Sequence, residues 1–231
     1  MTLIYKERTL DGFKDRGGHV YSDLEFRDCA FVSCHLSVTE VPENRTIVRR
    51  VKAVNCEVTA CWLWTGVFED ILVDGLKTHN MLASWGAVFK HVTLKGPIGQ
   101  VMLNYAVGLG RATAEVQRAF DEANALYYGS VDWALDIGQG EFREADIRGI
   151  PSRLIRRHAE TQAVVTRQKA LEGRWRQLDL SKTWWATSIE HFAKYSNDPD
   201  VVLVAPKRHP RFRHLLDGIR RLRAEGIAEP D

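Results

Sequence analysis

The sequence predicts a mainly β fold with helical additions, in which short parallel strands wind into a solenoid. A five-residue repeat of apolar positions supports this, and two helical regions interrupt and follow the repeat. The longest run of the repeat extends without a gap over residues 56–75. Its first positions are Cys56, Cys61, Gly66 and Ile71, and its third positions are Val58, Leu63, Phe68 and Val73.

A period of five matches neither an α-helix nor a plain strand. It suits a short strand followed by a corner, because positions one and three of a strand face the same side while the other residues turn the chain. Four such sides make about one winding of a square solenoid, which buries its apolar pairs against the neighbouring windings. The same residues leave a β-sandwich of alternating strands open as the other fold.

The closest copy of the repeat reads Ala145-Asp146-Ile147-Arg148-Gly149, and other copies lie in blocks at residues 20–38, 54–77, 86–96 and 134–150. These blocks resemble the pentapeptide-repeat family, whose motif is Ala, then Asp or Asn, then Leu, then two variable residues. The resemblance implies a right-handed parallel β-helix, here irregular, with breaks at 39–53, 78–85 and 97–133. Some members of that family imitate DNA with an acidic surface and protect type II topoisomerases from drugs or toxins.

The pattern divides the chain into two parts. Residues 1–150 hold the solenoid and a helical insertion at about 110–128, and residues 151–231 form a mostly helical region packed on it. In the second part we expect a helix from Pro151 to about Gly173 and another over 183–195. A buried strand at 201–205 and a helix from Pro210 to about Ala224 complete it.

The inserted helix is rich in alanine and places Val116, Phe120, Ala123 and Leu126 on one stripe. Glycines before a helix can cradle a phosphate on exposed backbone N–H groups. The glycines at 108 and 110 match neither the dinucleotide fingerprint nor the P-loop, so a plain turn is the preferred interpretation.

Four cysteines form two C-x4-C pairs, Cys29 with Cys34 and Cys56 with Cys61, which is a spacing that zinc sites also use. All four occupy the small inward position of the repeat, where a free cysteine acts as a compact apolar filler. The core interpretation is therefore preferred over zinc, and no metal or cofactor is predicted.

Composition is that of an ordinary globular protein, with 231 residues, 45% hydrophobic and 27% charged. The net charge is +2, with 12 basic and 12 acidic residues in 1–96, 4 and 8 in 97–150, and 16 and 10 in 151–231. No secretory h-region and no apolar run long enough to span a membrane is recognised, so we expect a cytoplasmic location and no membrane partner.

Two tryptophans are the sharpest anomaly of the repeat. If Cys61 and Leu63 point inward, alternation places Trp62 and Trp64 outward on one side, which is a patch that monomers seldom expose. Either a helix from elsewhere, such as those of the carboxy-terminal part, covers them, or they bind a partner protein together with Trp85. A homodimer is also left open.

Basic residues gather at the start of the last helix, at Lys207, Arg208, Arg211 and Arg213. A helix start with this charge would attract an anion, although a solvated basic face is the simpler interpretation. With Arg220, Arg221 and Arg223 further along, nucleic-acid binding is an alternative function.

Three histidines could approach one another on a solenoid surface, because strands stack about 4.8 Å apart. A wall-sited enzyme or metal site built from His35, His79 and His91, with Asp70 and Asp74 near them, is therefore a second alternative. The sequence contains no hydrolase, kinase or dinucleotide-binding motif.

The preferred function is a non-catalytic protein-binding solenoid of the immunity or scaffold type. DNA mimicry is disfavoured because residues 1–96 are charge-balanced, whereas a DNA mimic needs a dense negative charge.

Overall fold

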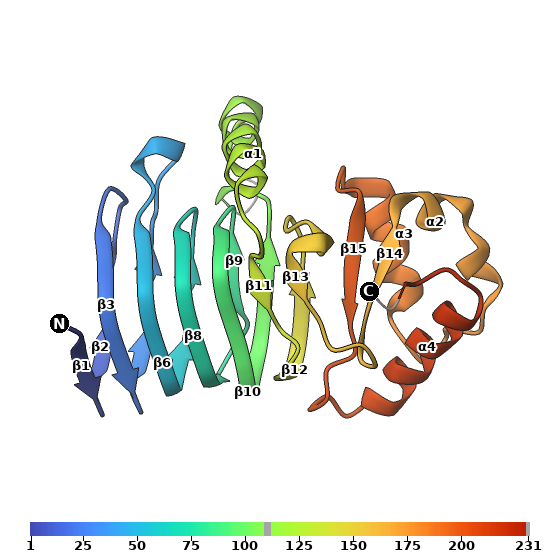
Figure 1. The fold of residues 1–231 in the computed structure, drawn as a ribbon, viewed down its shortest axis with the longest axis horizontal. Helices are drawn as coiled ribbons and strands as arrows, with labels where there is room; N and C mark the ends of the chain where they lie inside the picture. Colours follow the sequence, from blue (N-terminus) through green and yellow to red (C-terminus); the bar gives the residue numbers. More distant parts are fainter. Residues whose placement is uncertain (109–111, 230–231) are drawn as a thin grey trace.

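The computed structural model describes residues 1–108 and 112–229. It is mainly β, with one curled sheet that is parallel from β1 to β12 and with helices placed beside and beyond it (Figure 1). The strand order along the sheet is β1-β3-β6-β8-β10-β12-β15-β14, and short strands pair beside this path. The predicted combination of a mainly β fold with parallel strands and helical additions is confirmed.

The amino-terminal strands are β1 (Leu3–Lys6), β2 (Thr9–Asp11), β3 (Val20–Arg27), β4 (Ala30–Val32), β5 (His35–Leu36), β6 (Ile47–Thr59) and β7 (Trp62–Leu63). The later strands are β8 (Val67–Thr78), β9 (Leu82–Trp85), β10 (Val88–Asn104), β11 (Leu135–Asp136), β12 (Gly140–Ile147), β13 (Ile155–Arg156), β14 (Gln162–Thr166) and β15 (Asp200–Val204). The helices are α1 (Ala114–Gly129), α2 (Arg167–Glu172), α3 (Trp185–Tyr195) and α4 (Phe212–Ala224), with 3-10 turns η1 (Pro42–Asn44), η3 (Ser152–Leu154) and η4 (Arg174–Gln177).

Long strands bend so that their two halves pair with different neighbours. The first half of β6 pairs with β3 and its second half with β4, while β8 lies along its other side. Matching residues therefore stack from strand to strand. One register row joins Leu3, Leu24, Val51, Ile71, Val92, Leu135 and Ile155.

The inward positions of the repeat share one hydrophobic core. Val58 and Phe68 are buried in it, and Leu63 and Val73 pack against it, as the five-residue period predicts. The sheet also extends beyond the predicted blocks, because β6 begins at Ile47 and β9 falls inside the expected break at 78–85.

The cysteines stack in pairs inside the sheet. Cys29, Cys56 and Cys61 are buried and Cys34 is half-buried, and all four are free thiols. Their sulfur atoms donate to backbone carbonyls, as the Cys29 Sγ does to Tyr5 O and Arg27 O. Burial raises the pKa of the Cys56 and Cys61 thiols. These environments are those of core fillers, and in the described ranges no three His, Cys, Asp or Glu side chains cluster as metal ligands.

Strands β14 and β15 correct the prediction of one continuous helix after Pro151. Ile155–Arg156 and Gln162–Thr166 instead form β13 and β14, because the β-branched run before Arg167 pairs antiparallel with β15. The helix begins only at Arg167, where Thr166 accepts from the Lys169 N–H, and ends at Gly173, whose φ is 74°.

The two-stranded layer β14–β15 separates two cores. Val164, Val202 and Val204 face the main core, whereas alternate residues such as Val165 and Leu203 face the cluster formed with α2, α3 and α4. The predicted strand at 201–205 and the helices over 183–195 and 210–224 are confirmed within a few residues.

The stripe predicted for the inserted helix is only partly right. The buried residues of α1 are Phe120, Asn124 and Tyr128, whereas Leu126 is 81% exposed. The reason is Arg45, whose guanidinium lies over the Phe120 ring and donates to Asn124 Oδ1. The buried face of α1 therefore includes a polar residue, Asn124, beside the aromatic ones. Residues 109–111, which include part of the glycine segment before this helix, lie outside the described residues.

Among the described residues, no helix is both long and apolar enough to cross a membrane.

Candidate binding wall and the pocket at its end

One side of the sheet carries a row of outward residues that ends in a pocket. We call this side the tryptophan wall: the outward side chains of β5, β7 and β9 and of the adjoining ends of β10 and β12. Its alternate residues Leu36, Leu63 and Leu103 belong to or pack on the core, so the residues beside them face out. The outward row is His35, Trp62, Ala83, Met102 and Asp146, in which Ala83 itself is only 1% exposed.

Tryptophans dominate the early part of this wall. The rings of Trp62 and Trp64 are stacked, with centroids 6.2 Å apart and planes at 22°. Because Leu63 pairs with Ser84, Trp64 and Trp85 are the next residues on adjacent strands. All three tryptophans are half-buried, and the indole nitrogens of Trp64 and Trp85 are buried.

The carboxy-terminal helices do not cover these tryptophans. They pack on β14 and β15, at the far end of the sheet from β7 (Figure 1). Their cluster contains Trp175, Trp184 and Trp185, and Trp62 and Trp64 are absent from it. The expectation that helices of residues 151–231 lie over Trp62 and Trp64 is therefore wrong. The physical reason is that the apolar faces of these helices are already satisfied by β14 and β15.

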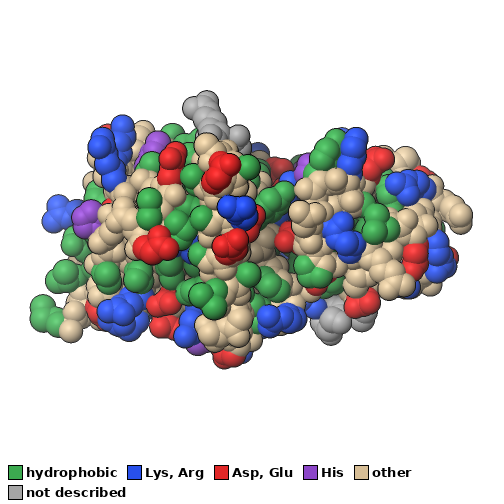
Figure 2. Space-filling view, turned by 90° about the horizontal axis from the view of Figure 1, so that it is seen from above, with side chains coloured by type: hydrophobic (Ala, Val, Ile, Leu, Met, Phe, Trp, Pro, Cys, Tyr) green, Lys and Arg blue, Asp and Glu red, His purple; other side chains and the backbone are tan. Residues whose placement is uncertain are grey.

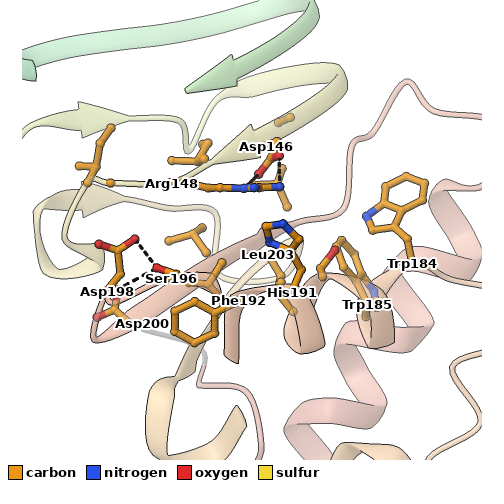
Figure 3. A pocket seen from close by; sticks show the side chains of 18 of the residues that line it. Asp146, Arg148, Trp184, Trp185, His191, Phe192, Ser196, Asp198, Asp200 and Leu203 are labelled. Atoms are coloured by element: carbon orange, nitrogen blue, oxygen red, sulfur yellow. Dashed lines mark hydrogen bonds and ion pairs between the residues drawn. The ribbon is translucent and has the colours of Figure 1, made fainter. Parts of the chain in front are cut away.

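A pocket of about 430 Å³ lies where the wall reaches β15 (Figure 3). Strands β12 and β15 share a single register pair, Ile147 with Val202, and separate on either side of it. Residues of β12, α3 and β15 line the opening that this leaves. The pocket therefore marks the place where the parallel sheet changes to antiparallel.

An ion pair sits at the wall side of the pocket. The Arg148 guanidinium donates to both carboxylate oxygens of Asp146, at 2.9 and 2.6 Å. Both side chains remain about one-third exposed. Asp146 belongs to the outward row of the wall, so this pair connects the tryptophans with the pocket.

A half-buried carboxylate lies on the opposite side. Burial raises the pKa of Asp198, although Ser196 Oγ donates to it at 2.8 Å and the Gly149 N–H also donates. The loop is held by Arg167, which donates to the carbonyls of Ser196 and Asp198. Figure 3 shows Asp198 and Asp200 at one end of the pocket, and Trp184 and Trp185 at the other.

A histidine and a serine–aspartate turn also line the pocket. His191, from α3, points into it in Figure 3 and contacts the Tyr195 ring at 4.9 Å. The hydrogen bond between Ser196 and Asp198 belongs to a local turn, since the Asp198 N–H also donates to Ser196 Oγ. Within the described part of the chain, the recorded hydrogen bonds link no hydroxyl of this pocket to a histidine base.

The three histidines proposed as a site do not converge. His35 lies 6.4 Å from the Trp64 ring, on the tryptophan wall. His79 bonds to Glu57 at 2.9 Å, and His91 lies between Asp70 and Asp132, at 3.0 and 2.7 Å. Each histidine belongs to a different register row, because residues share a row only when about one winding of chain separates them.

The His91 cluster is a surface ion-pair group. Hydrogen bonds from the His91 ring to the carboxylates of Asp132 and Asp70 raise the pKa of His91, and the ring stacks on Trp133 at 4.7 Å. The guanidinium of Arg156 covers the Trp133 ring at 4.0 Å. Of the predicted site, therefore, only the approach of Asp70 to His91 is present, while Asp74 pairs with Lys95.

The predicted anion-binding residues lie around the start of α4. Lys207 is half-buried and Arg208, Arg211 and Arg213 are exposed. Arg208 lines a groove of about 320 Å³ together with Lys77 and Arg143, and its N–H donates to Phe142 O. The groove brings basic side chains from distant segments together, but the other three predicted residues do not line it.

The later arginines of α4 are engaged within the protein. Arg220 pairs with Glu160 at 2.7 Å, Arg221 donates to Asp179 O, and Arg223 donates to the carbonyls of Glu160 and Gln162. These contacts of the basic residues hold α4 against the segments beside it.

Sequence reasoning missed the pocket residues Asp146, Arg148, His191 and Asp198. A signal existed for the first two, because they flank the inward Ile147 of the clearest repeat copy, and residues on either side of an inward strand residue face outward. No comparable signal existed for His191 or Asp198, which reach the pocket through the packing of α3 on β15.

A scan against models of known protein families finds no match to this chain, and a search of curated proteins finds no relative.

Proposed function

We propose that this chain is a non-catalytic protein-binding protein that holds its partner on the tryptophan wall. The single observation that carries the proposal is the stacked, half-buried pair Trp62 and Trp64, which lies beside Trp85 on a hydrogen-bonded sheet and which the carboxy-terminal helices do not cover. Tryptophans on a rigid surface lose little conformational entropy on binding and are the residues most enriched at the centres of protein interfaces.

The sheet supports a finer proposal about the fold, namely a pentapeptide-repeat-like β-helix. Residues with positive φ precede matching strand residues in successive rows, as at Asp23, Arg50, Asp70 and His91, whose φ values are 52–59°. Each stands directly before one of the stacked residues Leu24, Val51, Ile71 and Val92. A corner repeated at the same register is what a solenoid of short sides requires.

A protein partner fits the charge of the surface better than a nucleic acid does. Acidic and basic side chains are interspersed with apolar ones on the face shown in Figure 2. Nucleic-acid binding depends on a continuous field of unpaired basic groups. Arg220 and Arg221 of α4 are engaged in contacts inside the protein, which leaves mainly the start of that helix for phosphates.

The pocket extends the proposal to the chemistry of the partner. Its lining includes the carboxylates of Glu144, Asp146, Asp198 and Asp200, against the cations of Arg148 and, when protonated, His191. This excess of acidic groups, flanked by Trp184 and Phe192, favours a basic side chain whose stem packs on the rings. A partner lying along the wall would place an arginine or lysine there, which suits an immunity-type or scaffold protein.

The test is capture of the partner from an extract of the organism that makes this protein. Full-length chain and the variant with Trp62→Ala and Trp64→Ala serve as bait, and Trp133→Ala is the matched control, because Trp133 is also half-buried on a different row. We expect the wall variant to lose at least about tenfold in affinity for the captured protein, measured by calorimetry. Equal affinity of the folded wall variant and the control would refute the proposal.

A second variant tests the pocket separately. Asp146→Asn together with Asp198→Asn removes two carboxylates and keeps the size of the side chains. We expect a weaker and less salt-sensitive complex if a basic side chain of the partner enters the pocket. An unchanged salt dependence would place the partner on the tryptophans alone.

A further inference from the structure

The amino-terminal edge of the sheet is an unoccupied strand edge with an apolar surface. We propose that a second copy of this chain docks there, pairing its own β1 antiparallel with β1 across a two-fold axis. This inference goes beyond the proposed function, because it uses a different surface from the tryptophan wall.

Backbone geometry leaves half of β1 free to pair. Strand β1 is parallel to β3, with Ile4 opposite Glu25 and Lys6 opposite Arg27, and the Glu7 N–H donates to Arg27 O. Strand residues alternate the side to which their N–H and C=O groups point. The groups of Ile4 and Lys6 therefore point away from β3, where no other strand of the described chain lies.

The edge lacks the usual protection against strand pairing. Proline, a bulge or a charge in the middle of the strand blunts most natural edges. Here the central residues are Leu3, Ile4 and Tyr5, and the only charge is the terminal Lys6. Such an edge remains unpaired only if something covers it.

Apolar side chains surround this edge. Leu3, Ile4 and Tyr5 are 51%, 54% and 39% exposed, and Phe13 and Val20 are 41% and 54% exposed. Figure 2 shows apolar side chains gathered at this end of the molecule. Leu3 and Tyr5 occupy rows that continue inward as Leu24 and Phe26, which are half-buried and pack against the core. The surface is therefore the uncovered end of the hydrophobic core.

The charged residues around the edge favour a second copy of this chain as the docking partner. Lys6, Arg8, Glu7 and Asp11 stand on or beside the first strands, and no ion pair is recorded for them among the described residues. Deeper in the sheet, charged residues pair with the next strand, as Arg50 does with Asp23 and Lys77 with Glu57. A rim with both signs is complementary to its own two-fold copy, whereas a partner of one sign would leave half of it unpaired.

Sedimentation of the untagged full-length protein tests the proposal first. We expect the mass of a dimer at about 100 µM, with dissociation on dilution toward about 1 µM or below. Ile4→Pro removes an outward N–H without touching the bonds to β3, so we expect a folded monomer whose far-ultraviolet circular dichroism is unchanged. Leu126→Ser is the matched control, because it removes an equally exposed apolar side chain from α1 and leaves the dimer intact.

Cross-linking identifies the surface directly. In the proposed dimer, Ile4→Cys and Lys6→Cys variants form an intermolecular disulfide with a mild thiol oxidant, while Leu126→Cys and the parent protein do not. A monomeric parent at about 100 µM, or a dimer that persists in Ile4→Pro without cross-linking through residues 4 or 6, would overturn the proposal. The Trp62→Ala, Trp64→Ala variant should remain dimeric, so the two proposals fail independently.

Discussion

The two ends of the sheet carry similar apolar residues, but only one end is covered by further strands of the described chain. At the carboxy-terminal end, β15 and β14 cross the last strands antiparallel, and Val202 and Val204 are 6% and 3% exposed. At the amino-terminal end, no strand of the described residues lies beyond β1, and its Leu3 and Tyr5 are 51% and 39% exposed. In a stacked parallel sheet, the burial of an apolar strand is therefore decided by what lies beyond it, and only secondarily by its own composition.

The difference predicts an uneven distribution of stability. Burying apolar area contributes about 25 cal/mol per Å², so Val202 and Val204 contribute more for their size than Leu3 and Tyr5, which are 51% and 39% exposed. Strands at the open end should also exchange their amide hydrogens first, because little buried area is lost when they detach. The following predictions compare matched residues at the two ends.

The largest contrast is expected for two aromatic truncations. Phe142 on β12 is 1% exposed and lies in the main core, whereas Tyr5 on β1 is exposed. We expect Phe142→Ala to cost about 3–5 kcal/mol of unfolding free energy and Tyr5→Ala below about 1 kcal/mol. Urea denaturation at a concentration where the chain is monomeric measures both. Equal costs would mean that the amino-terminal end is covered within the single chain.

A second contrast concerns two glycines with positive φ. Gly149, with φ of 76°, would bring a Cβ within 2.6 Å of Tyr105 Cβ, whereas Gly12, with φ of 66°, has no heavy atom within 4 Å of the same position. Gly12→Ala should therefore cost only the backbone strain, about 1–2 kcal/mol. Gly149→Ala adds overpacking and should cost about 2–4 kcal/mol. Thermal unfolding of both variants separates strain from crowding, and a smaller loss for Gly149→Ala would contradict this packing.

The pH dependence that a carboxyl group gives to the stability of the fold should have opposite signs at the two ends of the sheet. Burial alone would raise the pKa of Asp15, but hydrogen bonds from Thr46, Ser37 and His19 lower it, so its stabilisation is lost as pH falls below about 4. Burial raises the pKa of Asp198, so its contribution is present below about pH 4 and is lost as pH rises through the folded value.

Two variants, one for each carboxyl group, measure how these contributions to stability change with pH. The Asp15→Asn variant should be less stable than the parent at about pH 6. This difference in unfolding free energy should shrink as the pH falls toward about 3. As the pH rises from about 4, the parent loses the stabilisation from Asp198. The unfolding free energy of Asp198→Asn should therefore increase relative to that of the parent. Urea midpoints across that range give both curves, and parallel curves for either variant and the parent would show that the carboxyl does not titrate as described.

Much of the fold was predictable because it follows from local pattern. The five-residue period places Val58 and Phe68 in one core, and the helical spacing of residues 212–222 predicts the buried face of α4. The predicted helix over 155–166 failed for a tertiary reason. Its residues have helix-compatible spacing, but pairing with β15 satisfies the backbone of Ala163 to Thr166 in a strand.

The candidate site was predictable only where it lies on the repeat. Alternation around Leu63 places Trp62 and Trp64 outward, and the same rule applied to Ile147 would have identified Asp146 and Arg148. The other wall of the pocket comes from α3 and the loop before β15, so His191 and Asp198 reach it only through long-range packing. No sequence period encodes how β12 and β15 separate.

The smallest effect is expected from the ion pairs between stacked strands. Arg50 donates to both oxygens of Asp23 at 2.7 Å, but the side chains are 48% and 37% exposed, so Arg50→Ala should lower the urea midpoint only slightly. Arg8→Ala, which removes a rim residue without a recorded ion pair, should leave the stability of the monomer unchanged. At a concentration where the dimer forms, Arg8→Ala should cost more stability than Arg50→Ala. The reason is that Arg8 then gains a partner across the two-fold axis, while Arg50 already has one. Urea midpoints at low and high protein concentration test this reversal, and an Arg8→Ala effect that is independent of concentration would exclude the rim from the dimer contact.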